Sequence, residues 1–165
     1  MLSNQQHTIS LLVNNKPGVL IRISLVFARR GYNIDSLVVS PAKEARYSRM
    51  TITASGDIAT LEQIIKQLNK LVDVLHATDH TDHSVVEREL ALVKVACTSE
   101  DRAEILQIAE HFKCDSVDLS QTTLMMEVTG SSAKLDAMMI MLRDYDVNET
   151  VRTGKILMAR GSSET

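Results

Sequence analysis

The sequence predicts an α+β fold in which the order strand, helix, strand, strand, helix, strand occurs twice. Short segments with alternating apolar and polar residues are typical of half-buried strands. Longer segments with apolar residues at helical spacing are typical of amphipathic helices. In addition, a pattern of glycine, leucine, an apolar pair and leucine recurs at equal spacing in both halves. We therefore expect two ferredoxin-like βαββαβ units in tandem, each a sheet with two helices on one face.

The first half begins with a strand and a helix. Ile9, Leu11 and Val13 alternate with polar residues, which predicts a strand over 7–14. The helix that follows ends at Gly31. The other strands of this half are expected over 33–40, 48–54 and 72–78. The apolar faces of its two helices consist of Val19, Leu20, Ile23, Val26 and Phe27, and of Leu61, Ile64, Ile65, Leu68 and Leu71.

The second half repeats this order of elements. Strands are expected over 91–98, 116–120 and 124–129, and a single last strand is expected within 148–159. The helix faces consist of Ile105, Ile108, Ala109 and Phe112, and of Leu135, Met138, Met139 and Leu142. Equal spacing of the apolar residues preserves which side of each helix faces its sheet, so the corresponding helices should pack alike.

The duplication favours two domains over the alternative of one larger α+β domain. Gly56 precedes Leu61 in the first half as Gly130 precedes Leu135 in the second. Apolar periodicity lapses between the halves, where charged and polar residues suit a solvated linker. The expected domain bounds are 7–79 for the first domain, 80–89 for the linker and 90–161 for the second domain.

Composition excludes several classes of protein. With a net charge of −3 and only 3% aromatic residues, the 165-residue chain has neither a long basic tract nor a base-stacking surface for nucleic acid. No apolar run approaches membrane-spanning length and the N-terminus does not look like a signal peptide, so we expect a cytoplasmic protein. Cys97 and Cys114 are too few for a thiolate metal site or a disulfide framework.

A histidine cluster lies in the expected linker region. His76, His80 and His83 alternate there with Asp79 and Asp82, and histidines three or four residues apart could hold a divalent metal if the segment were helical. Nothing in the pattern predicts a helix, so a solvated segment is the better interpretation. We expect no functional metal site in this chain.

The loop Asn15-Lys16-Pro17-Gly18 is the candidate binding element. Proline suits a first helical turn and Asn15 could cap the helix. Glycine in a first turn costs about 1 kcal/mol relative to alanine, but it would let a small anion approach the free N–H groups of the helix N-terminus. The second half enters its first helix at 98–103 with two acidic residues and no glycine. A small anionic metabolite such as an amino acid fits this loop better than a phosphate does, because no phosphate-loop motif follows the strand.

Several runs of the sequence resemble one protein family. These are NNKPGVLIRISLVFARRGYNIDSLVVSP, SRMTITASGD, LEQIIKQLNKLVDV and VERELALVKV. They are similar to the regulatory (small) subunit of acetohydroxyacid synthase, also called acetolactate synthase. The resemblance covers nearly the whole chain and is densest in the first half, which would be an ACT domain, a βαββαβ ligand-sensing module.

The resemblance implies a regulatory role in branched-chain amino acid biosynthesis. Two ACT domains of a homodimer would bind the feedback inhibitor, usually valine, at their interface. The subunit would do no chemistry itself. It would activate a separate catalytic (large) subunit, in which thiamine diphosphate, Mg and FAD are expected, and make it sensitive to valine. The implied ligand residues are Asn15, Gly18, Val19 and Leu20 of one chain with Asn33 and Ile34 of the other.

The spacing of these residues agrees with a site shared between two chains. Gly18 and Asn33 flank opposite ends of a helix of about 13 residues, which spans about 20 Å. Two chains related by a twofold axis can bring opposite helix ends together, because such a contact uses the same patch from each side.

Two other functions remain as alternatives. An enzyme would need a nucleophile next to a general base, and no histidine of the chain stands in such a motif. We expect the histidines at the surface or in the linker. They are His7, His76, His80, His83 and His111. A free-standing ACT-type sensor could act on another enzyme or regulator, but no third domain is left for a DNA-reading helix-turn-helix. The sequence leaves open whether valine, leucine or isoleucine is the preferred effector.

Overall fold

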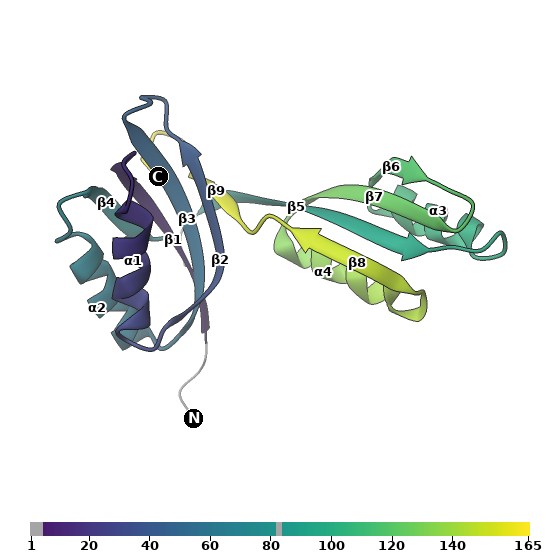
Figure 1. Ribbon diagram of the computed structural model, residues 1–165, viewed down its shortest axis with the longest axis horizontal. Helices are drawn as coiled ribbons and strands as arrows, with labels where there is room; N and C mark the ends of the chain where they lie inside the picture. The colour runs from purple at the N-terminus through teal and green to yellow at the C-terminus, as the bar shows by residue number, and fades with distance from the viewer. Residues whose placement is uncertain (1–4, 82–83) are drawn as a thin grey trace. The chain divides into compact units, whose positions relative to one another are not determined.

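The computed structural model describes residues 5–81 and 84–165, which form two compact units (Figure 1). The first unit contains the chain up to Val86 together with the C-terminal segment Gly154–Thr165. The second unit is Glu87–Thr153. Each unit is an antiparallel sheet with two helices on one face, so the predicted pair of ferredoxin-like units is confirmed.

The first unit has the order βαββαβ, with its sheet strands in the order β2-β3-β1-β4. Its elements are β1 (Gln5–Asn14), α1 (Val19–Ala28), β2 (Asn33–Pro41), β3 (Tyr47–Gly56), α2 (Ile58–Leu68) and β4 (Val74–Asp79). The apolar residues of β1 and β3 alternate toward the helices, as a half-buried sheet requires. Ile9, Ile23 and Ile64 are fully buried where sheet and helices meet.

The second unit repeats this order and has the sheet order β6-β7-β5-β8, with β9 pairing with β5 off that path. Its elements are β5 (Val85–Ala96), α3 (Arg102–His111), β6 (Asp115–Leu119), β7 (Thr123–Gly130), α4 (Ser132–Met141), the 3-10 turn η1 (Leu142–Asp144) and β8 (Val147–Arg152). The last strand of the chain, β9 (Ile156–Ala159), lies in the segment that belongs to the first unit. The core of the second unit is separate from the first and includes Val93, Ile105 and Met126.

The two sheets share their irregularities as well as their strand order. The pairing register shifts between Leu12 and Val13 in β1, and between Lys94 and Val95 at the corresponding place in β5. A second pair of shifts falls in β2 at 34–36 and in β6 at 116–118. Bulges at matching positions are the expected result of two copies of one supersecondary unit.

The repeated glycine and leucine pattern marks matching helix starts. Asp57 caps α2 by accepting a hydrogen bond from the N–H of Thr60, and Ser131 caps α4 by accepting one from Lys134. The residues that face the sheets are Leu61, Ile64 and Leu68 in the first unit and Leu135, Met138 and Leu142 in the second, all buried. The predicted equivalence of the two helices is confirmed.

Gly56 and Gly130 occupy matching positions but have different neighbours. A Cβ added at Gly56 would lie 2.3 Å from the ring of Tyr32, which is buried and donates a hydrogen bond to the carbonyl of Asp57. A Cβ added at Gly130 would lie 2.5 Å from the flexible end of the Lys134 side chain, which can move aside. The glycine is therefore more strongly required in the first unit.

The chain's last strand differs from the prediction. The expected single strand within 148–159 is two strands, β8 and β9, separated by a glycine with φ of +85°. The break occurs because the chain leaves the second unit at Thr153 and continues in the first. At the other boundary, β5 already begins at Val85, inside the expected linker 80–89. The unit bounds therefore differ from the expected domain bounds at both ends of the second unit.

Two histidines expected at the surface or in the linker are buried. His7 is 1% exposed on the helix-facing side of β1 and lies 3.3 Å from the carbonyl oxygen of Gly56. His80 is 6% exposed, and its Nε2 lies 2.8 Å from Ser10 Oγ. The sequence expectation is wrong for both, because each imidazole is covered by elements far away in the sequence. His76 and His111 are exposed, whereas His83 lies outside the described residues.

Candidate ligand-binding loop

The glycine loop between β1 and α1 differs locally from the sequence expectation. Gly18 itself is the N-cap of α1, with left-handed backbone angles (φ 82°, ψ −8°). Pro17 lies before the helix in a turn rather than in its first helical turn. Asn15 does not cap the helix, because its side-chain Nδ2 donates to the carbonyl of Ala45, 3.0 Å away.

The left-handed conformation explains why this position is glycine. A residue with a Cβ loses roughly 1–2 kcal/mol in that region of φ and ψ, whereas glycine loses almost nothing. The site is also open, since a Cβ added at Gly18 would meet no described atom within 4 Å. Glycine therefore both permits the turn and leaves the entry to the helix uncovered.

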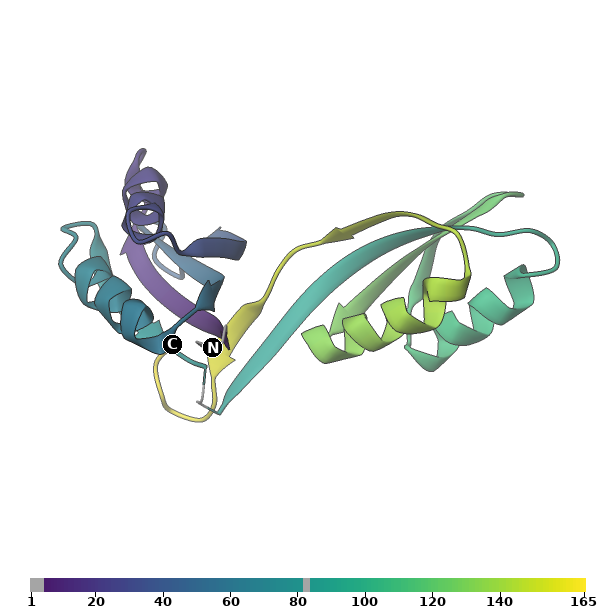
Figure 2. The same ribbon diagram turned by 90° about the horizontal axis from the view of Figure 1, so that it is seen from below.

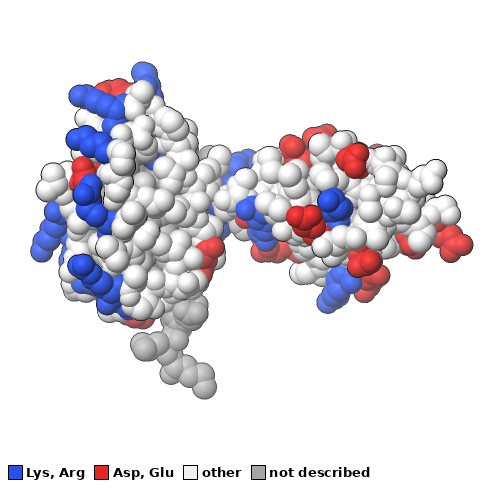
Figure 3. Space-filling view, viewed as in Figure 1, with Lys and Arg blue, Asp and Glu red and all other residues white. Residues whose placement is uncertain are grey.

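The start of α1 has the features that would attract an anion. The first N–H groups of any helix lack intrahelical partners and carry the positive end of the helix dipole. The first turn of α1 contains no acidic residue, and its N-cap makes no side-chain hydrogen bond. Lys and Arg side chains gather on the surface of the first unit around α1, as Figure 3 shows. A carboxylate would be attracted to this end of the helix.

The matching loop of the second unit is closed by its own side chains. Thr98 Oγ1 accepts hydrogen bonds from the N–H groups of Glu100 and Asp101, and donates one to the Asp101 carboxylate. Glu104 adds a negative charge to the first turn of α3. Thr98, rather than either acidic residue of the loop, accepts these backbone hydrogen bonds. The first turn of α3 therefore carries negative charge, whereas the first turn of α1 contains no acidic residue and the nearby Asp73 carboxylate is paired with Arg22.

The structure places the remaining sequence-predicted site residues at the two ends of α1. Val19 is buried in the core, so only its backbone faces the loop, whereas the Leu20 side chain is 40% exposed. Asn33 and Ile34 follow the far end of the helix, beyond Gly31, at the start of β2. Because α1 has 10 residues, it separates the two groups by about 15 Å. Within one chain the two groups do not meet.

Asn33 is held by its neighbours on β2. Its Nδ2 donates to Asp35 Oδ1 at 3.1 Å, and the other oxygen of Asp35 accepts from Ser55 Oγ at 2.5 Å. Asp35 is the bulged residue between Ile34 and Ser36. The sequence showed Asn33 as a candidate but gave no sign that a bulge and a carboxylate would orient it.

An apolar strip on α1 was also not identified from the sequence. Leu20, Ile21 and Leu25 are 40%, 66% and 43% exposed, although the opposite side of the same helix fills the core. The neighbouring β2 is an edge strand of the sheet, with Val39 exposed. The helical spacing of these residues could have revealed a second apolar face, because α1 is apolar nearly all round.

The histidine segment shows no metal-binding arrangement among the residues described. Over 5–81 and 84–165, no three His, Cys, Asp or Glu side chains are grouped as a metal ion requires. Two members of the predicted cluster, Asp82 and His83, lie outside these ranges. In the same ranges, every helix is too short or too polar to cross a lipid bilayer.

Two family models match the chain, one in each half. An AHAS small subunit-like ACT domain matches residues 9–76, and the model described as the small subunit of acetolactate synthase matches residues 88–161. The fold and the glycine loop therefore define a protein with an ACT domain followed by a second ferredoxin-like domain.

Known proteins that align with nearly the whole chain identify the family within this class. The chain is 44% identical over 159 residues to a probable acetolactate synthase small subunit of Archaeoglobus fulgidus, covering 96% of this chain and 99% of that protein. It is 47% identical to one of Methanothermobacter thermautotrophicus, covering 94% of each. The crystal structure of the acetolactate synthase small subunit from Thermotoga maritima superposes with a TM-score of 0.85 at 40% identity, covering 96% and 99%. The chain belongs to the acetolactate synthase small subunit family.

Proposed function

We propose that this chain is a regulatory subunit that activates the thiamine-diphosphate-dependent catalytic subunit of acetolactate synthase and makes it sensitive to feedback inhibition by valine. One observation carries the effector part of this proposal. The first unit opens α1 with an uncovered left-handed glycine and no acid in the first turn, whereas the second unit closes the same place with Thr98 and acidic residues. Only the first unit thus offers a carboxylate a helix N-terminus.

The ligand's two ends fit different parts of the loop. Its carboxylate would be bound by the N–H groups at Gly18 and Leu20, because the Val19 N–H already donates to the carbonyl of Lys16 at 3.4 Å, and the helix dipole would favour the negative charge. Its branched aliphatic side chain would pack on the exposed part of Leu20. Leucine and isoleucine share this chemistry with valine, so the binding measurement must compare all three.

A homodimer would complete the site. The exposed strip Leu20, Ile21 and Leu25 lies on α1, and β2 leaves its outer edge open to a second sheet. Apolar side chains and an edge strand are the two features that a second copy can cover. An isologous contact there would bring Asn33 and Ile34 of one chain to Gly18 of the other.

In this arrangement the chain contributes regulation and no catalysis. The ACT domain, residues 7–79, would sense the amino acid in the cytoplasm, and residues 90–161 would form the second domain of the subunit. Thiamine diphosphate, Mg and FAD would belong to the catalytic partner.

Reconstitution with an acetolactate synthase catalytic subunit tests the proposal. The chain alone should not turn over pyruvate, the mixture should be more active than the catalytic subunit alone, and valine should inhibit the mixture. Pull-down of the catalytic subunit would separate this function from that of a free-standing amino-acid sensor. Failure of the chain to bind or activate the catalytic subunit would contradict the proposal.

A further inference from the structure

The C-terminal segment 154–165, called here the C-terminal strap, belongs to the first unit although it follows the last strand of the second. Figures 1 and 2 both show it in yellow beside the sheet of the first unit. Its strand β9 pairs with β5, and Leu157 is buried at 6% exposure. Arg49 Nη1 on β3 donates to the carbonyl of Thr165 at 2.6 Å. Gly154 at the start of the strap packs against Ser36 on β2, so the strap contacts the first unit at both of its ends.

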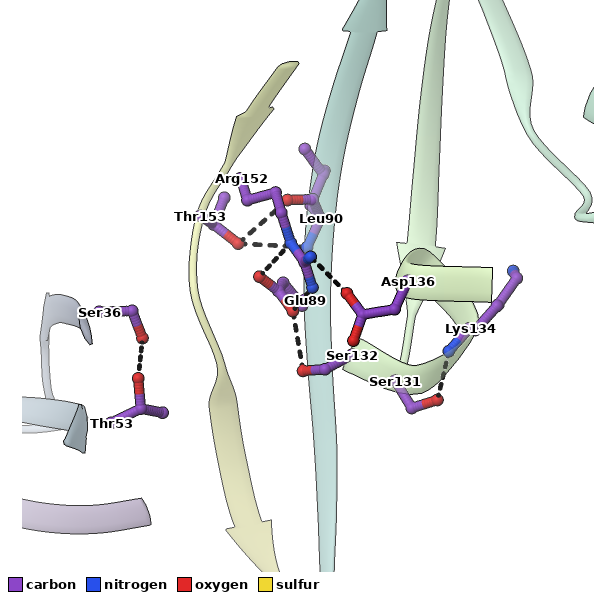
Figure 4. Close-up of polar contacts among 10 residues, drawn as sticks. All are labelled: Ser36, Thr53, Glu89, Leu90, Ser131, Ser132, Lys134, Asp136, Arg152 and Thr153. Carbon is purple, nitrogen blue, oxygen red and sulfur yellow. Dashed lines mark hydrogen bonds and ion pairs between the residues drawn. The ribbon is translucent and has the colours of Figure 1, made fainter. Parts of the chain in front are cut away.

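The chain just before the strap is held firmly within the second unit (Figure 4). Arg152 on β8 donates two hydrogen bonds to Glu89 on β5, at 2.9 and 2.8 Å, and one to Asp136 on α4 at 2.6 Å. Ser132 Oγ donates to the same Glu89 carboxylate at 2.9 Å. Burial raises the pKa of Glu89, but the hydrogen bonds from Arg152 and Ser132 outweigh it and lower the pKa overall.

The next two residues pass from one unit to the other. Thr153 bonds with its backbone N–H to the carbonyl of Leu90 at 3.0 Å, and its hydroxyl accepts from the Leu90 N–H at 3.1 Å. Gly154, one peptide bond later, packs on β2 of the first unit. A displacement at one of these residues is passed directly to the other through the covalent chain.

Gly154 is packed so closely on β2 that no side chain fits. A Cβ added there would lie 2.7 Å from Ser36 Cβ and 2.8 Å from Ser36 Oγ. Ser36 cannot turn away without cost, since its hydroxyl is bonded to Thr53 Oγ1 at 2.6 Å (Figure 4). Gly154 also has a φ of +85°, which favours glycine independently of the contact. Both requirements apply to the same residue.

Ser36 is the first residue paired with β3 after the bulge in β2. Asn33 and Ile34, the candidate effector residues, precede the same bulge, and the bulged Asp35 holds the Asn33 side chain. A bulge leaves one residue unpaired, disrupts the ladder locally and bends the strand. The contact with Gly154 thus lies directly beside the unpaired residue of β2 that holds the Asn33 side chain.

We propose that the contact of Gly154 with Ser36 couples the effector end of β2 to β8 of the second unit. The part of this inference that concerns inhibition rests on the function proposed above. Effector binding at Asn33 and Ile34 sets the position of the β2 bulge, the bulge sets the position of Gly154, and Gly154 acts on β8 through Thr153. Gly154 is a positioning residue in this scheme, since it does not touch the effector.

The test compares three full-length variants, using hydrogen exchange without any effector. Gly154→Ala should speed amide exchange in both β2 and β8. Gly161→Ala is the matched control, because Gly161 lies in the same strap with a φ of +66° and an added Cβ there meets no described atom within 4 Å. It carries the same backbone penalty without the clash, and should leave β2 unchanged. Ser36→Gly combined with Gly154→Ala removes the clash and should restore exchange in β2 toward that of the parent.

The second readout is valine inhibition of the reconstituted complex. Gly154→Ala should raise the half-inhibitory valine concentration by at least about fivefold, the lower end of typical allosteric couplings, whereas Gly161→Ala should not. Equal exchange in the Gly154 and Gly161 variants, or no rescue by Ser36→Gly, would overturn the coupling. Unchanged inhibition in Gly154→Ala would overturn its part in regulation. If Gly154→Ala alters hydrogen exchange in β2 and β8 but valine does not inhibit the parent complex, the coupling between the strands stands. The assignment of valine as the effector is then refuted.

Discussion

Gly18 allows the proposed binding of a carboxylate to be tested by a single charge. Gly18→Asp and Gly18→Asn introduce side chains of nearly the same size. Both residue types tolerate left-handed backbone better than other non-glycine residues, and an added Cβ at Gly18 meets no described atom within 4 Å. The two variants therefore differ mainly in one negative charge at the entrance to α1.

The expected loss of affinity follows from Coulomb repulsion. Two unit charges about 4 Å apart repel by about 1 kcal/mol in water and about 4 kcal/mol at the effective dielectric constant of about 20 found near protein surfaces. Because about 1.4 kcal/mol is a tenfold change in a binding constant, the Asp variant should bind valine about fivefold to several hundredfold more weakly than the Asn variant. The aspartate also competes for the helix N–H groups and stabilises the N-terminus of α1. The fold should therefore survive.

The assay is a valine titration of the reconstituted complex, with direct binding to the subunit measured in parallel. The Asp variant should activate the catalytic subunit but resist valine, and the Asn variant should remain inhibited at higher valine concentration. Gly18→Ala reports the backbone cost alone, about 1–2 kcal/mol for left-handed angles. If the Asp and Asn variants lose inhibition equally, charge is not the cause. If Gly18→Asp stays as sensitive as the parent, the loop is only a helix start.

Three further predictions concern stability and assembly. Gly56→Ala should destabilise the protein by about 1–3 kcal/mol in urea unfolding, because a buried tyrosine ring packs on it, and Gly130→Ala should cost clearly less; equal losses would refute this reasoning. The pKa of Glu89 lies below its ordinary value of 4.5, so its stabilising contribution is complete above that pH and is lost as the pH falls through the lowered pKa. The Glu89→Gln variant should therefore show a shallower loss of unfolding free energy between about pH 5 and pH 3, and parallel curves would contradict this. Ile21→Glu should convert the proposed dimer to a monomer, as measured by sedimentation. Ile58→Glu, a charge at a similarly exposed helix position, should not. A parent protein that is itself monomeric would exclude the dimer.

The sequence predicted the strands and helices well, because burial of one face is a local pattern. Ile9, Leu11 and Val13 show a half-buried strand through their own alternation, and all three are buried. The break at Gly154 was not predictable in this way. The chain passes there from the second unit to the first, where Gly154 packs on Ser36, a residue far away in the sequence. Without knowledge of that contact, the residues around Gly154 continue the strand pattern.

The candidate site was predicted by residue type but not by conformation. The sequence singled out Gly18 because a glycine there would let an anion approach the helix N-terminus, whereas its left-handed backbone appeared only in the structure. Val19 fits the helical periodicity as a core residue, and its burial leaves the backbone as its only means of contacting a ligand. The burial of His80 depends on Ser10, a residue of another strand. Such contacts are set by tertiary packing, which local sequence patterns do not predict.

The two units share one fold but differ at two matching positions. Their bulges fall at matching positions, and the same offset along the chain pairs Gly18 with Glu100 and Ser36 with Asp118. In the first unit both positions hold small neutral residues, and in the second both hold carboxylates. Small residues let another backbone or an anion approach closely, and carboxylates keep both away. The shared ferredoxin-like frame therefore does not determine which unit carries the proposed effector site. Two small residues, one at the start of α1 and one beside the bulge of β2, give the first unit both its proposed binding loop and its contact with the C-terminal strap.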